Sequence, residues 1–324
     1  MRLILFGTGP FAVPTYESLI GSHDVVALVT RPIADSGKRR KTAENPTRDL
    51  GEAKGLTILD PASCNEAAFV EQLVSLNADL FVVCDYGQIL SRDCLAAAKL
   101  GGINLHGSLL PKYRGAAPIQ WCVYNGDTVT GVTVIHMTAR LDGGPCIVKS
   151  QLDIGADETA EELEPRLSSL GVESVAKAIT MLESWDGESV LGELQDPAGI
   201  TKAPRLKKTD GLIDFGRTAK QICDQVRAFQ PWPKTFTNWT PENKSPIRLI
   251  VGRTAVVDAE QLTEETVVAD VPPGAVALCD SKRLWLQTES GLLSIVEIQP
   301  AGKRLMPVAD FLRGQQPKVG DVFA

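Results

Sequence analysis

Short apolar runs alternate with stretches of helical periodicity through the first half of the chain. The apolar runs predict buried strands, at Leu3–Phe6, Val25–Thr30, Leu80–Cys84, Gly102–Leu105 and Val132–Met137. Helical spacing lies between them, at Pro14–Ile20, 62–76, Cys94–Lys99 and Ala117–Asn125, and a long amphipathic segment follows at 158–184. Strands that alternate with helices predict an α/β fold built on a doubly wound, mostly parallel sheet.

The second half has a different pattern. The turn-forming run Asp196-Pro197-Ala198-Gly199 predicts a linker at 196–204, which divides a domain at 1–195 from one at 205–324. A helix predicted at Ala219–Phe229 precedes the breaking sequence Pro231-Trp232-Pro233. Short strands follow, predicted at Ile247–Val251, Ala255–Asp258, Gly274–Leu278, Leu284–Gln287 and Leu292–Gln299. Five short strands with turn residues between them favour a small β-barrel.

Composition limits the class of protein. The chain has 324 residues, of which 44% are hydrophobic and 23% are charged, so it can form two domains with substantial cores. No apolar run approaches the ~18–20 residues of a membrane helix, and no signal-peptide pattern leads into the first strand. Seven cysteines, odd in number and without a CxxC pair, fit reduced thiols and neither a disulfide framework nor a zinc site. We therefore expect a cytoplasmic protein with no metal and no membrane partner.

Net charge is unevenly distributed. Residues 1–200 carry 16 Lys and Arg against 26 Asp and Glu, a net charge of −10, whereas residues 201–324 carry 17 against 14, a net charge of +3. A mildly basic second half is compatible with a nucleic-acid partner. The run Lys38-Arg39-Arg40-Lys41 after Gly37 is, from the residues alone, either a solvated loop or a loop that contacts phosphates.

Three residues suit acyl transfer. Asn104 and His106 lie two apart on a predicted strand, so both side chains face the same side. Asp142 lies in a predicted tight loop within Leu141-Asp142-Gly143-Gly144. An amide donor, a titratable imidazole and a carboxylate that orients it can stabilise an oxyanion. None of the three is a nucleophile, so the substrate must bring its own.

The sequence from Ile103 to Gln120, INLHGSLLPKYRGAAPIQ, resembles the core motif of the methionyl-tRNA formyltransferases. That motif by itself indicates any folate-dependent formyltransferase. The resemblance extends over nearly the whole chain and includes the opening MRLILFGTGPFA. Two later elements, Arg227–Pro233 (RAFQPWP) and Gln299–Arg304 (QPAGKR), narrow the likeness to the tRNA enzymes.

The resemblance implies an enzyme that moves a formyl group from 10-formyltetrahydrofolate to the α-amine of methionyl initiator tRNA, for translation initiation. Asn104 would donate a hydrogen bond to the oxyanion and Asp142 would orient His106, which acts either as a charged stabiliser or as the base that takes the amine proton. The implied C-terminal barrel is OB-like and, with Lys38, Arg39, Arg40 and Lys41, would hold the tRNA. The folate pocket would be lined by Tyr86, Gly87, Ser108, Leu109, Leu110 and Pro111.

Two positions depart from the family's usual pattern. Gly143 stands where the family commonly has threonine, and Asp85 stands where it has alanine. Asp85 either contacts the pterin or faces solvent. The turn Gly7-Thr8-Gly9 invites a dinucleotide interpretation, but Pro10 removes a backbone donor and no acidic residue ends the second strand. The resemblance implies that this turn is structural.

Other functions stay open at this stage. A formyltetrahydrofolate hydrolase or a sugar-amine formyltransferase could reuse Asn104, His106 and Asp142. A non-catalytic RNA-binding protein is the other class, and the complete trio argues against it. We expect a monomer.

Overall fold

The computed structural model describes residues 1–33, 44–241, 245–262 and 267–324. The predicted tRNA-binding run Lys38, Arg39, Arg40 and Lys41 lies outside these residues. Contacts divide the chain into two compact units. The first contains residues 1–119, 129–154 and 162–204, and the second contains residues 120–128, 155–161 and 205–324. Two short segments of the predicted N-terminal domain therefore pack within the C-terminal unit.

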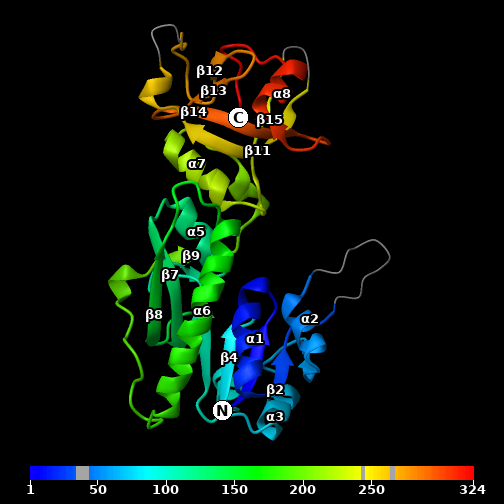
Figure 1. Cartoon of the computed structure of the whole chain (residues 1–324), viewed down its shortest axis with the longest axis vertical. Helices are drawn as coiled ribbons and strands as arrows, with labels where there is room; N and C mark the ends of the chain where they lie inside the picture. Colours follow the sequence, from blue (N-terminus) through cyan, green and yellow to red (C-terminus); the bar gives the residue numbers. More distant parts are fainter. Residues whose placement is uncertain (34–43, 242–244, 263–266) are drawn as a thin grey trace. The chain divides into compact units, whose positions relative to one another are not determined.

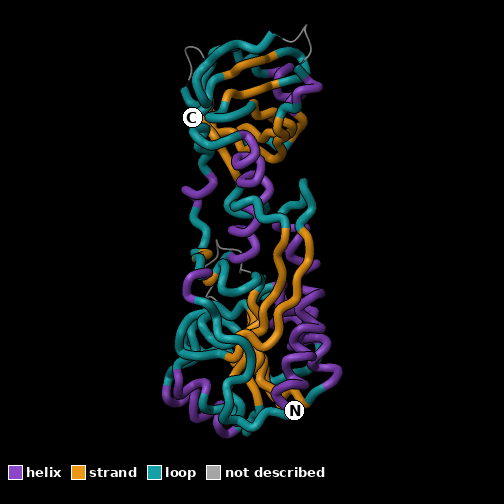
Figure 2. The backbone as a smooth tube through the Cα atoms, turned by 90° about the vertical axis from the view of Figure 1, so that its left-hand side faces the viewer, coloured by secondary structure: helices purple, strands orange, loops and turns teal. Residues whose placement is uncertain are grey.

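The first unit is built on a seven-stranded sheet in the order β3-β2-β1-β4-β5-β7-β8 (Figures 1 and 2). Its strands are β1 (Arg2–Gly7), β2 (Asp24–Val29), β3 (Ile58–Leu59), β4 (Leu80–Cys84), β5 (Gly102–His106), β7 (Val129–His136) and β8 (Cys146–Asp153). The first five pair in parallel. Strands β1 and β4 are almost continuously apolar because a parallel sheet is covered on both faces. The predicted mostly parallel α/β sheet is confirmed.

Strands β7 and β8 run antiparallel to their neighbours. Only residues 137–145 connect them, which is too short for the crossover that a parallel pair needs. The sequence analysis did not predict β8. Polar and apolar residues alternate in its second half, because it is an edge strand with one face exposed.

Helices cover both faces of this sheet. They are α1 (Val13–Ser22), α2 (Pro46–Ala53), α3 (Ala67–Ser75), α4 (Arg92–Leu95) and α6 (Ala160–Glu183). Phe69 and Leu73 of α3 pack in one core cluster with Phe6 and Phe81 of the sheet. On the other face, Gly171 of α6 lies so close to Leu105 that an added Cβ would come within 2.6 Å of it. A glycine at this point lets the long helix lie directly on β5.

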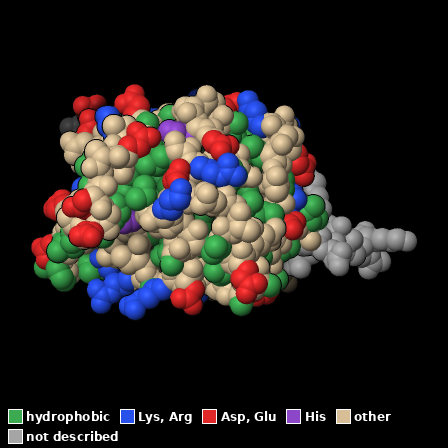
Figure 3. Space-filling view, turned by 90° about the horizontal axis from the view of Figure 1, so that it is seen from below, with side chains coloured by type: hydrophobic (Ala, Val, Ile, Leu, Met, Phe, Trp, Pro, Cys, Tyr) green, Lys and Arg blue, Asp and Glu red, His purple; other side chains and the backbone are tan. Residues whose placement is uncertain are grey.

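The surface of the described residues carries charges of both signs. Figure 3 shows basic and acidic side chains interspersed with apolar ones on the face that it views, and neither sign forms a continuous patch there. No helix among the described residues is both long and apolar enough to cross a membrane.

The second unit contains an antiparallel sheet in the order β10-β11-β14-β13-β12, with β15 paired to β14. The strands are β10 (Thr235–Trp239), β11 (Ile247–Val256), β12 (Val276–Cys279), β13 (Leu284–Gln287), β14 (Leu292–Pro300) and β15 (Met306–Pro307). Helix α7 (Ala219–Ala228), helix α8 (Val308–Gly314) and all but the first two residues of helix α5 (Pro118–Tyr124) belong to the same unit. The predicted β-rich C-terminal domain is confirmed, and the strands predicted at Leu284–Gln287 and Leu292–Gln299 correspond to β13 and β14.

One correction concerns β11. The strands predicted at 247–251 and 255–258 are a single strand, which bulges at Gly252 where the register with β14 shifts between Val251 and Arg253. The carbonyl of Gly252 accepts a hydrogen bond from the side chain of Gln230, at 2.6 Å. An apolar pattern interrupted by a bulge resembles two strands in the sequence. Strand β10, which follows the proline-rich turn, was not predicted.

The last residues join the two edges of this sheet. Ala324 exchanges backbone hydrogen bonds of 2.8 Å with Asn238 of β10, and Val276 of β12 donates to Asp321 at 2.9 Å. The sheet therefore closes on itself, as in a barrel. Phe323 is 1% exposed and stacks on Trp239, with ring centroids 6.0 Å apart.

Phe323→Ala should destabilise the C-terminal unit by about 3–5 kcal/mol, because it removes a fully buried aromatic side chain from the closing segment. Chemical denaturation followed by tryptophan fluorescence measures the loss. The neighbouring Val322 is 54% exposed, so Val322→Ala is the matched control and should change stability by less than ~0.5 kcal/mol. Equal effects of the two substitutions would contradict a closed barrel sealed by Phe323.

Candidate active site

Strand β5 brings Asn104 and His106 to the carboxyl edge of the parallel sheet, where ligands bind in open α/β folds. Asn104 pairs with Val83 of β4, and His106 lies two positions further along the same face. Asn104 is half-buried, and its side-chain amide makes no hydrogen bond with any residue that the structure describes. The amide is therefore free to donate to a ligand.

The imidazole of His106 is 5% exposed and contacts two groups. Its Nε2 lies 2.9 Å from the carbonyl oxygen of Tyr113. A carbonyl can only accept, so Nε2 carries a hydrogen and donates it. Nδ1 is therefore the ring atom that gains or loses a proton, and it faces Oδ1 of Asp142 at 3.8 Å. This distance exceeds a hydrogen bond but permits a charge contact between an imidazolium and a carboxylate.

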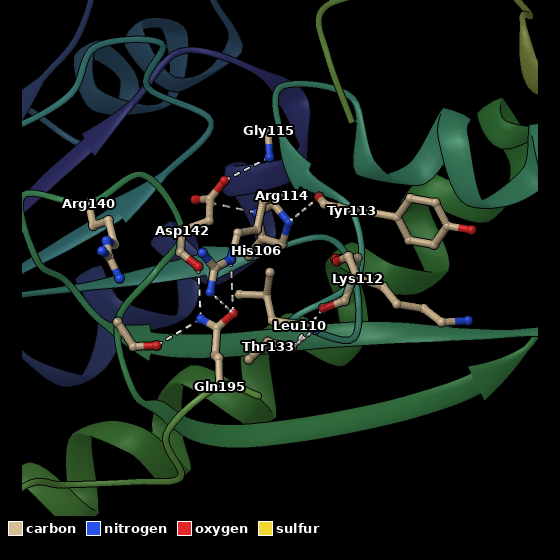
Figure 4. A network of polar contacts seen from close by, with 12 residues as sticks. His106, Leu110, Lys112, Tyr113, Arg114, Gly115, Thr133, Arg140, Asp142 and Gln195 are labelled. Atoms are coloured by element: carbon tan, nitrogen blue, oxygen red, sulfur yellow. Dashed lines mark hydrogen bonds and ion pairs between the residues drawn. The ribbon is translucent and has the colours of Figure 1, made fainter. Parts of the chain in front are cut away.

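The carboxylate of Asp142 is fixed in place by the backbone. It lies in the loop between β7 and β8, and its Oδ2 accepts a hydrogen bond of 2.8 Å from the N–H of Gly115. Asp142 has a φ of 46°, in the left-handed region that non-glycine residues seldom adopt. Gly144, two residues on, packs so tightly against the carbonyl of His136 that a Cβ would clash. The predicted tight loop is present and presents the carboxylate to His106 (Figure 4).

Gly115 is itself held by a second segment. Strand β6 (Arg114–Gly115) pairs in parallel with β9 (Lys202–Ala203), which lies in the stretch predicted as a linker. Gly115 has a φ of 133°, and a Cβ at this position would collide with the carbonyl of Ala203. A glycine is therefore required here on two counts, the backbone conformation and the close approach. The N–H that anchors Asp142 depends on this pairing.

The predicted folate-binding residues Ser108, Leu109, Leu110 and Pro111 form the loop after β5. The hydroxyl of Ser108 donates to the carbonyl of Lys112 at 2.7 Å. Thr133 of β7 donates its hydroxyl to the Ser108 carbonyl at 2.7 Å and accepts from the Leu110 N–H at 3.0 Å. The side chains of Ser108 and Leu110 are buried in the protein, so their contribution to a pocket would come from the shape of the loop. Their folate contact stays a prediction.

Tyr86 and Gly87, also predicted to line the pocket, follow the neighbouring strand β4. Tyr86 is 5% exposed and packs edge-on against Phe6, with ring centroids 5.3 Å apart. Burial raises the pKa of its hydroxyl, which therefore stays protonated at neutral pH. Gly87 is exposed, with a φ of 86°, and Asp85 before it is exposed with a φ of 50°. This turn lies at the same edge of the sheet as His106.

Two other residues have structural roles. His136 bonds the carbonyl of Leu100 through Nε2 at 3.0 Å and packs against Trp185. Gly7 packs against Tyr16 of α1, where a Cβ would come within 2.8 Å of the ring. No group of three or more His, Cys, Asp and Glu within the described ranges is placed to hold a metal ion.

The structure adds residues that sequence reasoning missed. Tyr113, Gly115 and Thr133 act through backbone or hydroxyl contacts with the loop and the trio. Arg114 donates to Oε1 of Gln195, whose amide in turn donates to the Asp142 loop. Tyr113, Arg114 and Gly115 lie inside the motif from Ile103 to Gln120, and that motif was the only sequence signal for them. Nothing in the local sequence of Gln195 indicated a role.

The arrangement suits addition to a carbonyl. An unpaired amide donor and an imidazole at one strand end can both face an oxygen that gains charge, and a carboxylate stabilises the protonated imidazole. With no nucleophilic side chain among the three residues, the attacking atom belongs to the substrate.

Two family models described as formyl transferase match the chain, one at residues 1–179 and a C-terminal domain at residues 205–316. The fold and the matched domains therefore define a two-domain formyltransferase, an enzyme class that uses 10-formyltetrahydrofolate as formyl donor. The chain belongs to the methionyl-tRNA formyltransferase family.

The relatives that support this assignment match over almost their whole length. The methionyl-tRNA formyltransferase of Rhodopirellula baltica is 44% identical over 329 residues, covering 99% of this chain and 96% of that protein. The enzyme of the same name from Citrifermentans bemidjiense is 37% identical, covering 99% and 95%. Among solved structures, an N-formyltransferase from Helicobacter canadensis with folinic acid and dTDP-3-aminofucose has a TM-score of 0.63 at 17% identity, covering 94% of this chain and all of that one. This last likeness shows the fold.

Gly115→Ala should disrupt the pairing of β6 with β9, because the added methyl group meets the Ala203 carbonyl. We expect a loss of more than ~2 kcal/mol in the free energy of unfolding, measured by urea denaturation. Gly187 is the matched control, since its φ is 80° and no heavy atom lies within 4 Å of an added Cβ. Gly187→Ala should cost only the strain of the positive φ, ~1 kcal/mol. A Gly115 variant no less stable than this control would contradict the close approach.

Proposed function

We propose that Asn104, His106 and Asp142 are the catalytic residues of a methionyl-tRNA formyltransferase. The enzyme transfers the formyl group of 10-formyltetrahydrofolate to the α-amine of methionyl initiator tRNA. The product, N-formylmethionyl-tRNA, serves translation initiation. The observation that carries the assignment of the site is the carboxylate of Asp142, held by the Gly115 N–H and facing Nδ1 of His106 at 3.8 Å.

The reaction begins when the amine attacks the formyl carbon. A C–N bond forms, and the π electrons of the carbonyl move to its oxygen, where Asn104 donates a hydrogen bond. The amine proton passes to Nδ1 of His106, directly or through water, and the resulting imidazolium is stabilised by Asp142. The oxyanion then reforms the carbonyl and the bond to N10 of the folate breaks. N10 takes up the proton that Nδ1 of His106 releases, directly or through water, which restores the neutral ring.

This pathway assigns the two ring nitrogens different tasks. Nε2 is committed to the Tyr113 carbonyl and holds the ring in position. Nδ1 alone exchanges protons in this assignment, which favours the neutral ring as base before attack and the charged ring as stabiliser after it. The two roles left open by the sequence are then successive states of one group.

The substrates occupy different parts of the protein in this proposal. The folate lies near Tyr86, Gly87 and the loop Ser108, Leu109, Leu110 and Pro111. The tRNA is held by the C-terminal domain at 205–324, joined by a connection at 196–204 to the catalytic domain at 1–195, and by Lys38, Arg39, Arg40 and Lys41. We further propose a cytoplasmic monomer.

The alternative substrates are not favoured. Sugar N-formyltransferases share the fold, with a TM-score of 0.63, but at 16–17% sequence identity. The curated relatives at 36–44% identity are named methionyl-tRNA formyltransferase, and they align with this chain over almost their whole length. The second domain matches the formyl transferase C-terminal family model as well.

His106→Ala and Asp142→Asn should each lower kcat by at least ~10², because both act on charge that develops during the reaction. Formylation of charged initiator tRNA, measured with saturating 10-formyltetrahydrofolate, gives the rates. Circular dichroism and the unfolding midpoint establish that both variants are folded. His136→Ala is the control for loss of a structural imidazole and should retain kcat within a few-fold. Near-normal turnover in either site variant overturns the mechanism.

Replacing Lys38, Arg39, Arg40 and Lys41 by alanine should weaken tRNA binding and its dependence on salt. Each neutralised phosphate contributes about −0.9 to the slope of log affinity against log salt on a duplex, so the slope should flatten by ~2–3 if most of the four contact phosphates. Filter binding from low to moderate salt measures the slope, and folate affinity should not change. An unchanged slope and KM would mean that the run is only a solvated surface.

A further inference from the structure

The residues between 193 and 203 run along the loops that build the active site. Glu193 exchanges two backbone hydrogen bonds with Cys146 at the start of β8, at 2.8 and 2.9 Å. Further on, Thr201 accepts through its hydroxyl from the Tyr113 N–H at 2.8 Å, and its carbonyl accepts from the Arg114 N–H at 2.9 Å. This segment, which we call the strap, is thus fastened on both sides of the Asp142 loop.

Gln195 lies between these two attachments and reaches the loop itself. Its side-chain Nε2 donates to the carbonyl of Asp142 and to the carbonyl of Gly144, each at 2.8 Å. Its Oε1 accepts from Nε and Nη2 of Arg114, at 3.1 and 2.7 Å. Figure 4 shows the amide between the loop and the guanidinium. Both hydrogens of the amide and its oxygen are therefore used.

Only a primary amide of this length satisfies the arrangement. The loop presents two acceptors and Arg114 presents two donors, so the side chain between them must donate twice at one end and accept at the other. A glutamate would keep Arg114 but oppose two carbonyls with a third acceptor. Methionine has a similar length and offers neither group.

The loop needs such a support. Asp142 has a φ of 46°, a left-handed conformation that is strained in a non-glycine residue. Gly143 and Gly144 follow it, and glycines permit many alternative backbone conformations. Two hydrogen bonds on the carbonyls of residues 142 and 144 restrict this three-residue turn. They hold the Asp142 carboxylate where Gly115 and His106 meet it.

We propose that Gln195 is a positioning residue of the reaction, which acts through Asp142 to fix the carboxylate against His106. The inference rests on the function proposed above, and it extends the site to the strap. Arg114 orients the Gln195 amide so that both hydrogens face the loop. The segment that joins the two predicted domains then also supports the active site.

The test uses three variants of the full-length protein. Gln195→Met removes both the donor and the acceptor of the amide. Gln195→Glu keeps the acceptor for Arg114 and removes the donors. Gln151→Met is the control, at an exposed position of β8. Both Gln195 variants should lower kcat by about 10–100-fold, because a carboxylate displaced by ~1 Å loses much of its effect. The KM values for tRNA and folate should stay within ~3-fold. The control should match the wild type.

A second measurement reports on the position of the carboxylate without substrate. The protein has three histidines, so the ring resonances of His106 can be assigned by comparison with His106→Ala and compared between variants by NMR. The ring resonances respond to the field of a carboxylate whose oxygen lies 3.8 Å from Nδ1. Moving Asp142 away should therefore shift these resonances in Gln195→Met at a fixed pH, and Gln151→Met should leave them unchanged.

A double variant separates positioning from general stability. In an Asp142→Asn background, Gln195→Met should lower kcat by less than ~3-fold more, since its target is already lost. Full additivity would mean that Gln195 does not act through Asp142. Unchanged kcat and unchanged His106 ring resonances in both Gln195 variants would also overturn the inference. If kcat falls in Gln195→Met but stays normal in Gln195→Glu, the effect comes from the contact with Arg114 and the inference is wrong. If Asp142→Asn and His106→Ala themselves retain turnover, the proposed function fails, which is a distinct result.

Discussion

The carboxylate of Asp142 is the group on which the site depends. It accepts a hydrogen bond from the N–H of Gly115 at 2.8 Å and faces the imidazole of His106 at 3.8 Å. It therefore connects its own loop to β5 and to β6, both of which lie more than 25 positions earlier in the chain. With a side chain that is 9% exposed, the carboxylate gives up most of its hydration. A buried carboxylate must be compensated by hydrogen-bond donors. Gly115 supplies one donor, and in the proposed reaction His106 adds a positive charge once it has taken up the amine proton.

This requirement explains several features that otherwise look unrelated. The pairing of β6 with β9 places the Gly115 N–H, and it works only because residue 115 has no Cβ. The Tyr113 carbonyl holds Nε2 of His106, so that the other ring nitrogen turns toward Asp142. Thr133 ties the loop after β5 to the antiparallel strand β7. The first two contacts each restrict one partner of the carboxylate, and the third fixes the loop that follows His106.

The departure from the family's usual loop fits the same picture. The family resemblance implies threonine where this chain has Gly143, and a hydroxyl could tie the loop from within. Here the tie comes from outside, through the two hydrogen bonds that Gln195 donates to the carbonyls of residues 142 and 144. Glycine makes the turn easy to form but poorly restricted. A restraint from the strap compensates for that freedom.

The sequence alone predicted the parallel core of the sheet and most of the helices, and it suggested Asn104, His106 and Asp142 as a catalytic trio. Buried parallel strands must be apolar, so the apolar runs of the sequence predicted β1 and β4. The i and i+2 spacing put Asn104 and His106 on one face, because side chains alternate along any strand. Family motifs supplied the activity. These features depend on the sequence of neighbouring residues, so the pattern of apolar and polar positions is enough to predict them.

Only the tertiary structure decided how Asp142 meets His106, and which residues support them. The edge strand β8 and the bulged β11 escaped prediction because exposure and register depend on neighbouring strands. Gly115 and Gln195 act through a backbone N–H and an ordinary side-chain amide, which have no sequence pattern of their own. Their value arises from segments brought together by folding. Hydrogen bonds between residues 53 and 51 positions apart in the chain, from Gln195 to Asp142 and Gly144, can be found only in three dimensions.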